Sequence, residues 1–255
     1  MNDSVPSAKR SRPDDEEVVR SNIWMRAGDI VLQAENTQFR VNSDILARQS
    51  SVFADMFELG KQTKDEEQIE GCPIVHLSDS AKDWDALLTA FYDPLAQREA
   101  VSIDLLCAML RLGYKYDMET CKQNALLRLQ FECPTNLGQM QNRRLRYTKV
   151  STETAELVIS CTILSLATEC GVQTAIPAAA LRVLDAYSLE EIMNVDPSVL
   201  SFSLKTTLVI AAERLRAKQR SVFASFSETG LPKQACVSRA TPNCAMKMRT
   251  LRDTL

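Results

Sequence analysis

The residue types that most often carry enzyme chemistry are scarce in this chain of 255 residues. It has one histidine, His76, and seven glycines, so imidazole catalysis, imidazole metal sites and glycine-rich phosphate loops lack their usual components. His76 alternates with Val75 and Leu77 in a strand-like run, which places its ring on the opposite face and predicts a surface imidazole. We therefore expect a protein that is not an enzyme and needs no cofactor.

The spacing of the cysteines does not indicate a metal site either. None of the eight cysteines belongs to a C-x-x-C pair. Cys236 and Cys244 flank Pro242 near the C-terminus, but they are too far apart for a zinc knuckle and have no two further ligands nearby. The acidic run 65–67 lacks the alternating ligands and the glycine of a calcium loop. We expect reduced, mostly buried thiols and no bound metal.

Charge is distributed unevenly along the chain. The net charge is −3, yet residues 203–255 carry ten Lys or Arg against three acidic residues. Residues 1–202 therefore have a net charge of −10. A basic end of this kind suits contact with RNA, DNA or an acidic protein surface, and it equally suits a solvated helix face and tail. We expect protein partners and disfavour nucleic acid.

The ends of the sequence predict an intracellular protein. The apolar stretch 157–166 is interrupted by Ser and Thr and is much shorter than the ~20 residues that cross a bilayer. Residues 1–20 mix Ser, Pro and charged residues with little that is apolar, which predicts a disordered tail rather than a secretion signal. The cluster Lys9–Pro13 suits nuclear import, although such clusters also arise by chance. We expect localisation to the nucleus or cytoplasm and no membrane partner.

A β-hairpin is predicted after this tail. Alternating apolar residues over 30–34 and again over 39–41 indicate two strands joined by the polar turn 35–38. An acidic, apolar-poor loop follows at 61–71, and the run 73–77 reads as a third strand.

Helices are predicted between and after these strands. Ser43 can cap one short helix, Ser50 or Ser51 a second, and Ser102 a longer one, in which Gly113 would let a neighbouring helix approach closely. The side chains that we expect in the core are Leu46, Phe53, Trp84, Leu87, Leu88 and Phe91. The last four follow the i, i+3, i+4, i+7 spacing of one helix face.

The second half of the chain has a different character. Residues 132–151 are polar and basic, which predicts a linker. Helical periodicity returns after it, over residues 152–170, 178–194 and 203–224. We therefore predict an all-helical region over 152–230, followed by a basic tail over 231–255.

The first half resembles the BTB/POZ domain. The segments similar to the family's strand and helix signature are Gly28–Leu32, Phe39–Val41, Leu46–Phe53, Met56–Phe57, Val75–Asp79 and Ala86–Pro94. The resemblance covers residues 21–131 and implies an α+β fold, a small β-sheet flanked by a helical cluster and followed here by an all-α region. The whole looks like fungal BTB/POZ proteins with a helical C-terminal extension. It implies a protein–protein interaction module that forms a homodimer and scaffolds a partner complex, with a role in transcriptional regulation.

Two departures from the family pattern bear on function. Asn42 and Ser43 replace the usual His-Lys, so the base that would face Asp29 is missing and a charged co-repressor pocket is disfavoured. Asp29 is then either a pocket acid or, as we expect, a hydrogen-bonded residue that organises the adjoining helix. Cullin-ligase adaptors carry a hydrophobic-x-Glu motif where this chain has 60–64, G-K-Q-T-K, which disfavours cullin binding and leaves the adaptor role as an alternative. The residues that we expect at partner or dimer interfaces are Ile23, Trp24, Met25, Asp29, Asn42, Ser43, Phe57 and Leu59.

Overall fold

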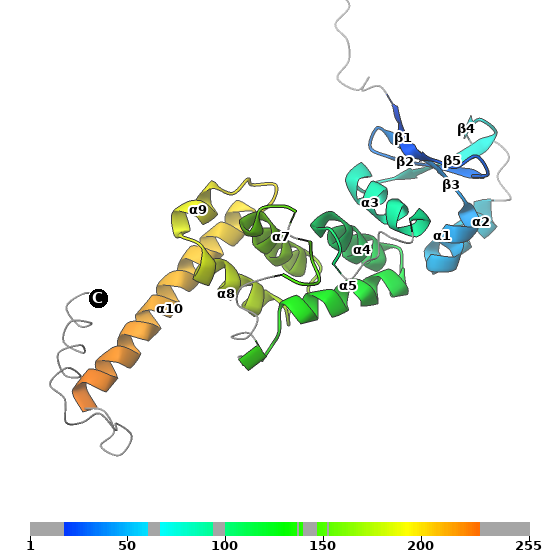
Figure 1. The fold of residues 1–255 in the computed structure, drawn as a ribbon. Coiled ribbons are helices and arrows are strands. Elements are labelled where there is room, and N and C mark those ends of the chain that lie inside the picture. The colour runs from blue at the N-terminus through cyan, green and yellow to red at the C-terminus, as the bar shows by residue number, and fades with distance from the viewer. Residues whose placement is uncertain are drawn as a thin grey trace, which may run out of the picture. The chain divides into compact units, whose positions relative to one another are not determined.

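The computed structural model describes residues 18–60, 67–93, 100–136, 138–139, 147–151 and 153–229. Most of the predicted N-terminal tail, the acidic loop and the basic C-terminal tail lie outside the described residues. A sheet and adjoining helices are followed by further helices, which confirms the predicted α+β fold (Figure 1). The chain divides into two compact units, Met1–Ser201 and Phe202–Leu255.

Five described strands form one sheet in the order β1-β3-β2-β5-β4. They are β1 (Val19–Trp24), β2 (Ile30–Ala34), β3 (Thr37–Val41), β4 (Gln68–Ile69) and β5 (Cys72–Leu77). β2 and β3 form the predicted antiparallel hairpin, and β5 runs parallel to β2. Val31 and Leu32 point to opposite faces and are both fully buried, so β2 is covered on both sides.

Strand β1 is an element that apolar patterning alone does not predict. It pairs in parallel with β3, with Val19 opposite Thr37 and Trp24 opposite Arg40, and the register shifts once along the pair. Its sequence, V-R-S-N-I-W, buries only Ile23. Backbone pairing with β3, rather than burial of one face, therefore defines this strand.

The hairpin turn is tighter than the predicted four-residue turn at 35–38. The strands pair up to a two-residue turn, Glu35-Asn36, in which Glu35 has a φ of 50°. Two-residue hairpin turns need this left-handed backbone because it matches the twist of the strands. Gln38 belongs to β3, in which it pairs with Gln33 across the hairpin. Its side-chain amide also donates to the Gln33 side chain at 2.8 Å, which satisfies a buried polar group.

Five helices lie between or after these strands along the chain. They are α1 (Ser43–Gln49), α2 (Ser51–Gly60), α3 (Ala81–Tyr92), α4 (Ile103–Lys115) and α5 (Glu119–Glu132). The hydroxyls of Ser50, Ser80 and Ser102 each accept a hydrogen bond at 3.1 Å from the backbone N–H three residues further on, and thereby begin α2, α3 and α4. Ser43, predicted as the cap of α1, is instead its first residue, because Asn42 occupies the cap position.

The structure places most of the predicted core as expected. The side chains that are at most 1% exposed include Leu46, Phe53, Trp84, Leu87 and Leu88. Phe91 is a correction: it is only partly buried, because it lies at the end of α3, which stops one residue later, at Tyr92. Gly113 permits the close approach that we predict, since a Cβ there would lie 3.0 Å from the backbone nitrogen of Lys122 on α5.

Further helices follow the first five. They are α7 (Glu156–Glu169), α8 (Ile176–Ala186), α9 (Leu189–Asn194) and, in the second unit, α10 (Phe202–Thr229). The single helix predicted over 178–194 is two helices, separated at Tyr187 and Ser188. Ser188 and Glu191 form a capping box that satisfies the first N–H groups of α9, so a new helix begins where continuous periodicity suggested one helix.

The described part of the segment predicted as a linker packs against the helices. Glu132, with a side chain 1% exposed, accepts hydrogen bonds from the backbone N–H groups of Thr148 and Lys149 at 2.8 and 2.5 Å. Val150 is buried as well. The two hydrogen bonds therefore fix Thr148 and Lys149 to the end of α5, and Val150 pairs with Val101 before α4.

Candidate interaction surfaces

The first candidate surface lies at the outer side of β1. We call Val18, Val19 and the outward-facing backbone of this strand the β1 edge. β1 is the last strand on its side of the described sheet, and Val18 and Val19 are 46% and 58% exposed. The N–H of Val19 donates inward to Asn36 at 2.7 Å, so the outward-facing groups come from alternate residues such as Arg20. An exposed edge strand of this kind is a template for pairing with another chain.

Ion pairs hold β1 to its own chain. The guanidinium of Arg20 lies 2.8 Å from Glu70 and 4.6 Å from the centroid of the Trp24 ring. Glu70 also pairs with Arg40 on β3 at 3.0 Å. Desolvation acts to raise the pKa of Glu70, but the charge and hydrogen bond of Arg20 bring that pKa below its ordinary value. Ile23 is buried as well, so β1 is held to its own chain. The opposite edge of the strand remains available to a partner.

A polar cluster stands at the end of the hairpin. Asp29 accepts hydrogen bonds from the backbone N–H of Ser43 at 2.7 Å and from its hydroxyl at 2.5 Å. Burial acts to raise the pKa of Asp29, but these hydrogen bonds bring it below its ordinary value. The backbone N–H of Asn42 donates to the hydroxyl of Tyr92 at 3.0 Å. The Asp29 carboxylate thus organises the start of α1, as the sequence predicts.

Helix α2 carries apolar side chains on two faces. On the inner face Phe53 is fully buried and Phe57 is partly buried, with ring centroids 5.6 Å apart. On the outer face Val52, Met56 and Leu59 follow i, i+4, i+7 spacing, and we call them the α2 stripe. Val52 is 38% exposed and Leu59 71%, which makes this stripe the second candidate surface.

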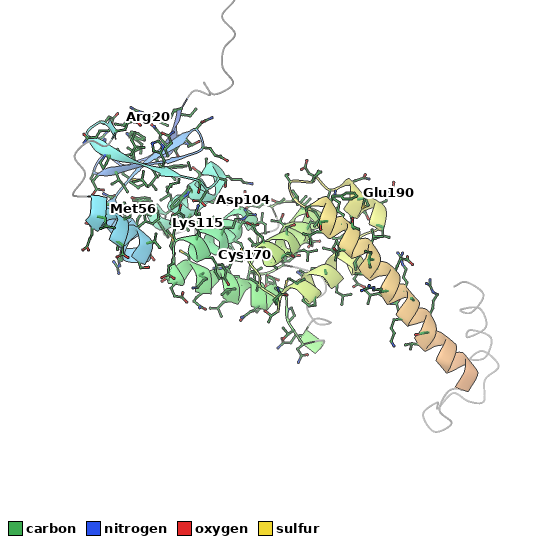
Figure 2. The ribbon with its side chains drawn as sticks, turned by 180° about the vertical axis from the view of Figure 1, so that it is seen from behind. Arg20, Met56, Asp104, Lys115, Cys170 and Glu190 are labelled. Carbon is green, nitrogen blue, oxygen red and sulfur yellow. The ribbon has the colours of Figure 1, made fainter. Side chains whose placement is uncertain are left out.

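The predicted interface residues fall in three separate places. Ile23, Trp24 and Met25 lie on β1 or directly after it, Asp29, Asn42 and Ser43 meet at the hairpin end, and Phe57 and Leu59 belong to α2. Of these residues only Asp29 and Leu59 are exposed; Ile23 is buried and the others are partly buried. Figure 2 shows Arg20 on the sheet and Met56 on α2, well separated, so the β1 edge and the α2 stripe are distinct surfaces.

The hairpin, the two short helices and the α3–α5 cluster correspond to a known domain, because residues 25–128 match the model of the BTB/POZ domain. Residues 25–128 form a BTB/POZ domain. Domains of this family are protein–protein interaction modules. A comparison with curated proteins gave no match to the chain. β1 and helices α7 to α10 lie outside the matched residues.

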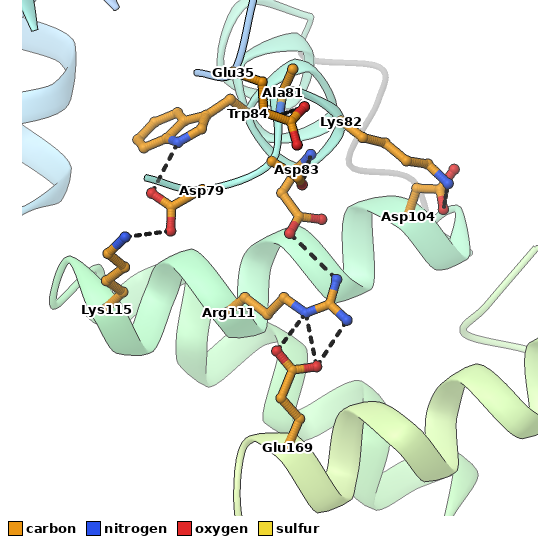
Figure 3. Close-up of polar contacts among 11 residues, drawn as sticks. Glu35, Asp79, Ala81, Lys82, Asp83, Trp84, Asp104, Arg111, Lys115 and Glu169 are labelled. Atoms are coloured by element: carbon orange, nitrogen blue, oxygen red, sulfur yellow. Dashed lines mark hydrogen bonds and ion pairs between the residues drawn. The ribbon is translucent and has the colours of Figure 1, made fainter. Parts of the chain in front are cut away.

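A polar cluster around Asp79 supports the inner side of α2 in the BTB/POZ domain (Figure 3). The carboxylate accepts hydrogen bonds from Lys115 and Tyr116 at 2.6 Å each and from the Trp84 indole at 3.4 Å. Burial raises the pKa of Tyr116 and the hydrogen bond to Asp79 raises it further, so the phenol stays a donor. The Tyr116 ring stacks on Phe53 with centroids 4.8 Å apart. This cluster therefore fixes α2 and, with it, the α2 stripe.

Arg111 connects the BTB/POZ domain to the first helix beyond it. In Figure 3 its guanidinium lies between Asp83 on α3 and Glu169 at the end of α7. Nε and Nη2 donate to Glu169 at 2.9 Å each, and Nη1 lies 3.4 Å from Asp83. Burial acts to lower the pKa of Arg111, but the hydrogen bonds to Glu169 outweigh it and raise that pKa. A bidentate arginine–carboxylate pair of this kind fixes the relative orientation of the two side chains as well as their distance. It therefore positions α7 against α4.

Of the six thiols in the described residues, five are buried and that of Cys170 is partly buried. Burial raises the pKa of Cys107 to about 12 and those of Cys121 and Cys133 to about 11, so these groups are protonated and poorly nucleophilic at neutral pH. Within the described residues, no three His, Cys, Asp or Glu side chains are grouped so that they could hold a metal ion. His76 is exposed and lies 3.8 Å from Glu67. None of the helices in the described part of the chain is long and apolar enough to cross a membrane.

Some residues of the candidate surfaces are missed by sequence reasoning. Glu70, which lies between β4 and β5, pairs with Arg20 on β1 and with Arg40 on β3. These residues are far apart in the chain, so the sequence holds no local signal for the contact. Val52 and Met56 lie in a helix that is apolar on both faces, so periodicity does not show which face is outward. The adjacent β-branched pair Val18-Val19 does carry a signal, because β-branched residues favour strands.

Proposed function

We propose that this protein is a non-enzymatic scaffold that forms a homodimer through the β1 edge, which directly precedes its BTB/POZ domain, and gathers a partner protein into a complex. The observation that carries the proposal is the exposed β1 edge, which ends the described sheet and bears two exposed valines. The proposal includes a role in transcriptional regulation in the nucleus or cytoplasm, as the sequence resemblance implies. It also assigns α7 to α10 to the helical extension of the fungal type.

In the proposed dimer, two copies of the β1 edge pair about a two-fold axis. Backbone N–H and C=O groups that now face outward would hydrogen-bond across the axis, and Val18 and Val19 of each copy would cover one another. A stable interface buries ~1,200 to 2,000 Å² in total. A strand of six residues supplies only part of that area, so the flanks of the sheet must contribute the rest.

Sedimentation velocity over a range of concentrations tests this proposal. We expect the wild type to associate into a species of twice its 28.5 kDa mass. Val19→Lys places a charge on the edge and should weaken association at least ~10-fold, because edge lysines oppose strand pairing. Val52→Lys, which changes an exposed valine on the α2 stripe, is the matched control and should associate like the wild type.

Two results would overturn the homodimer. One is a single 28.5 kDa species at high micromolar concentration. The other is association that Val52→Lys abolishes and Val19→Lys leaves intact, which would move the dimer face to α2. Both variants change side chains that are already exposed, so neither should unfold the domain.

A substrate adaptor of a cullin ubiquitin ligase is the second candidate function. The observation that favours it is Leu59, which is 71% exposed near the end of α2, just before the place where such adaptors carry their hydrophobic-x-Glu motif. Lys61 and Lys64 occupy that place in the sequence and lie outside the described residues. They reverse the charge that the motif would supply, and for this reason we rank the adaptor role second.

A further inference from the structure

Helix α10 carries an exposed segment that the homodimer proposal does not use. The helix runs from Phe202 to Thr229, 28 residues drawn as one uninterrupted helix in Figure 1. All side chains over 213–222 are exposed. Most helical stability in proteins comes from packing of one face, so a segment exposed on every side gains little of it. Such a segment is suited to packing against a partner.

An apolar stripe follows this segment of α10. Ala211, Leu215 and Val222 are spaced by four and seven residues, which brings them to one face of the helix. Leu215 is 44% exposed and Val222 42%. Lys218 occupies the position between them, where its aliphatic stem can continue the face. We call these four residues the α10 stripe.

Basic side chains stand on both sides of the α10 stripe. At 3.6 residues per turn, Arg214 and Arg216 lie about 100° from Leu215 on its two sides, whereas Arg220 lies about 140° away, toward the opposite face of the helix. Glu213 is the one acidic residue over 213–222, and it pairs with Arg216 at 3.0 Å. With Lys218 included, this segment has a net charge of +3.

We propose that the α10 stripe docks an acidic amphipathic helix of another protein. A second copy of α10 would set basic flanks against basic flanks in either orientation, which opposes pairing. Nucleic acid would neutralise the flanks but would leave Leu215 and Val222 in water. An acidic amphipathic helix covers the stripe and neutralises both flanks at once. The proposal goes beyond the homodimer and does not rest on association through the β1 edge.

The test is fluorescence anisotropy with the full chain and a labelled synthetic helix. The probe has Leu at positions a and d of each heptad and Glu at e and g, so that it offers an apolar stripe with acidic flanks. A second peptide has the same composition in scrambled order, and a third has Lys in place of Glu. We expect binding of the acidic helix at least ~10-fold tighter than binding of either control peptide.

Variants of the chain locate the contact. The double change Leu215→Ala with Val222→Ala should weaken binding at least ~10-fold, because it removes the apolar anchors while Ala keeps the helix intact. Ile210→Ala is the matched control: this residue is also exposed, at 48%, but it lies about 140° around the helix from Leu215. It should leave binding within ~2-fold of wild type. The double change Arg214→Glu with Lys218→Glu should make the chain bind the Lys peptide more tightly than the acidic helix.

Several results would overturn this proposal. The proposal fails if the scrambled peptide binds as tightly as the acidic helix, because binding would then not depend on an apolar stripe. It also fails if Ile210→Ala weakens binding as much as the Leu215→Ala, Val222→Ala change does. Salt-sensitive binding to duplex DNA or RNA that exceeds peptide binding and survives the Leu215→Ala, Val222→Ala change would assign the segment to nucleic acid. Self-association that this change abolishes would assign it to a second copy. Val19→Lys should leave peptide binding unchanged, so failure of the homodimer is distinguishable from failure of this site.

Discussion

Asp29 allows a decisive test, because its carboxylate is either a structural group or the acid of a partner pocket. Its two hydrogen bonds from Ser43, at 2.7 and 2.5 Å, satisfy an N–H group at the start of α1 in the way that a helix cap does. Asp29→Ala removes both bonds. Loss of a capping side chain typically costs ~1 kcal/mol, within a range of about 0.5 to 2, which lowers the folding equilibrium constant roughly fivefold.

Urea denaturation at neutral pH measures this loss. We expect Asp29→Ala to lower the midpoint and Asp29→Asn to lower it less, since the amide retains one acceptor oxygen. Ser43→Ala removes only the hydroxyl bond and should cost less than Asp29→Ala. In a double-mutant cycle the two changes should be non-additive by at least ~0.5 kcal/mol, because they remove the same contact.

The pH dependence gives an independent check. The pKa of Asp29 in the folded protein lies below its ordinary value of 3.8, so its contribution to stability is complete above that value. It is lost as the pH falls through the lower, folded-state pKa. The stability difference between wild type and Asp29→Asn should therefore narrow below pH 3.8. A variant with unchanged stability but impaired partner binding would refute the structural role and restore the pocket acid.

Three further predictions concern the packing and the partners of the domain. Leu88→Ala should cost ~2 to 5 kcal/mol by denaturation, because the side chain is fully buried, whereas the 65% exposed Leu127 changed to Ala should cost less than ~0.5 kcal/mol. Gly113→Ala should cost ~1 kcal/mol net, since its Cβ would meet the backbone of Lys122 at 3.0 Å while the helix gains propensity; a raised midpoint would show that α5 can move away. Calorimetry with a cullin N-terminal domain should show feeble binding or none, because Lys61 and Lys64 stand where adaptors carry an acid; sub-micromolar affinity would make the adaptor role the first candidate.

Much of the fold is predictable from the sequence where one periodic pattern determines one buried face. The hairpin and the stripe containing Trp84, Leu87 and Leu88 are examples, because each has large apolar residues at the period of its own element. The hydrogen bonds of Asp29 agree with the expectation from the sequence, although that expectation assumed a buried carboxylate and the side chain is exposed. Phe91 shows the limit of such predictions. The periodic pattern includes it, but the pattern does not show that α3 ends one residue later, at Tyr92.

Periodic apolar patterns do not determine β1 or the break between α8 and α9. β1 is defined by pairing with β3 and by the contact of Arg20 with Glu70, which is fifty residues away in the chain, and no local pattern records such a contact. At Ser188, apolar periodicity continues through the break, while the capping box acts through hydrogen bonds that a hydrophobic pattern does not register. Local polar chemistry overrides periodicity at this point.

The candidate surfaces are the hardest feature to predict, because exposure of an apolar residue depends on what the rest of the chain leaves uncovered. In α2 the two apolar faces are equivalent in sequence, and the choice between them is made by Tyr116 and Asp79, which hold Phe53 inward. Once Phe53 is buried, helical geometry forces Leu59 outward. The inner polar cluster thus determines which residues are available to a partner. Changes at Asp79 should therefore impair binding at the α2 stripe without any contact between Asp79 and the partner.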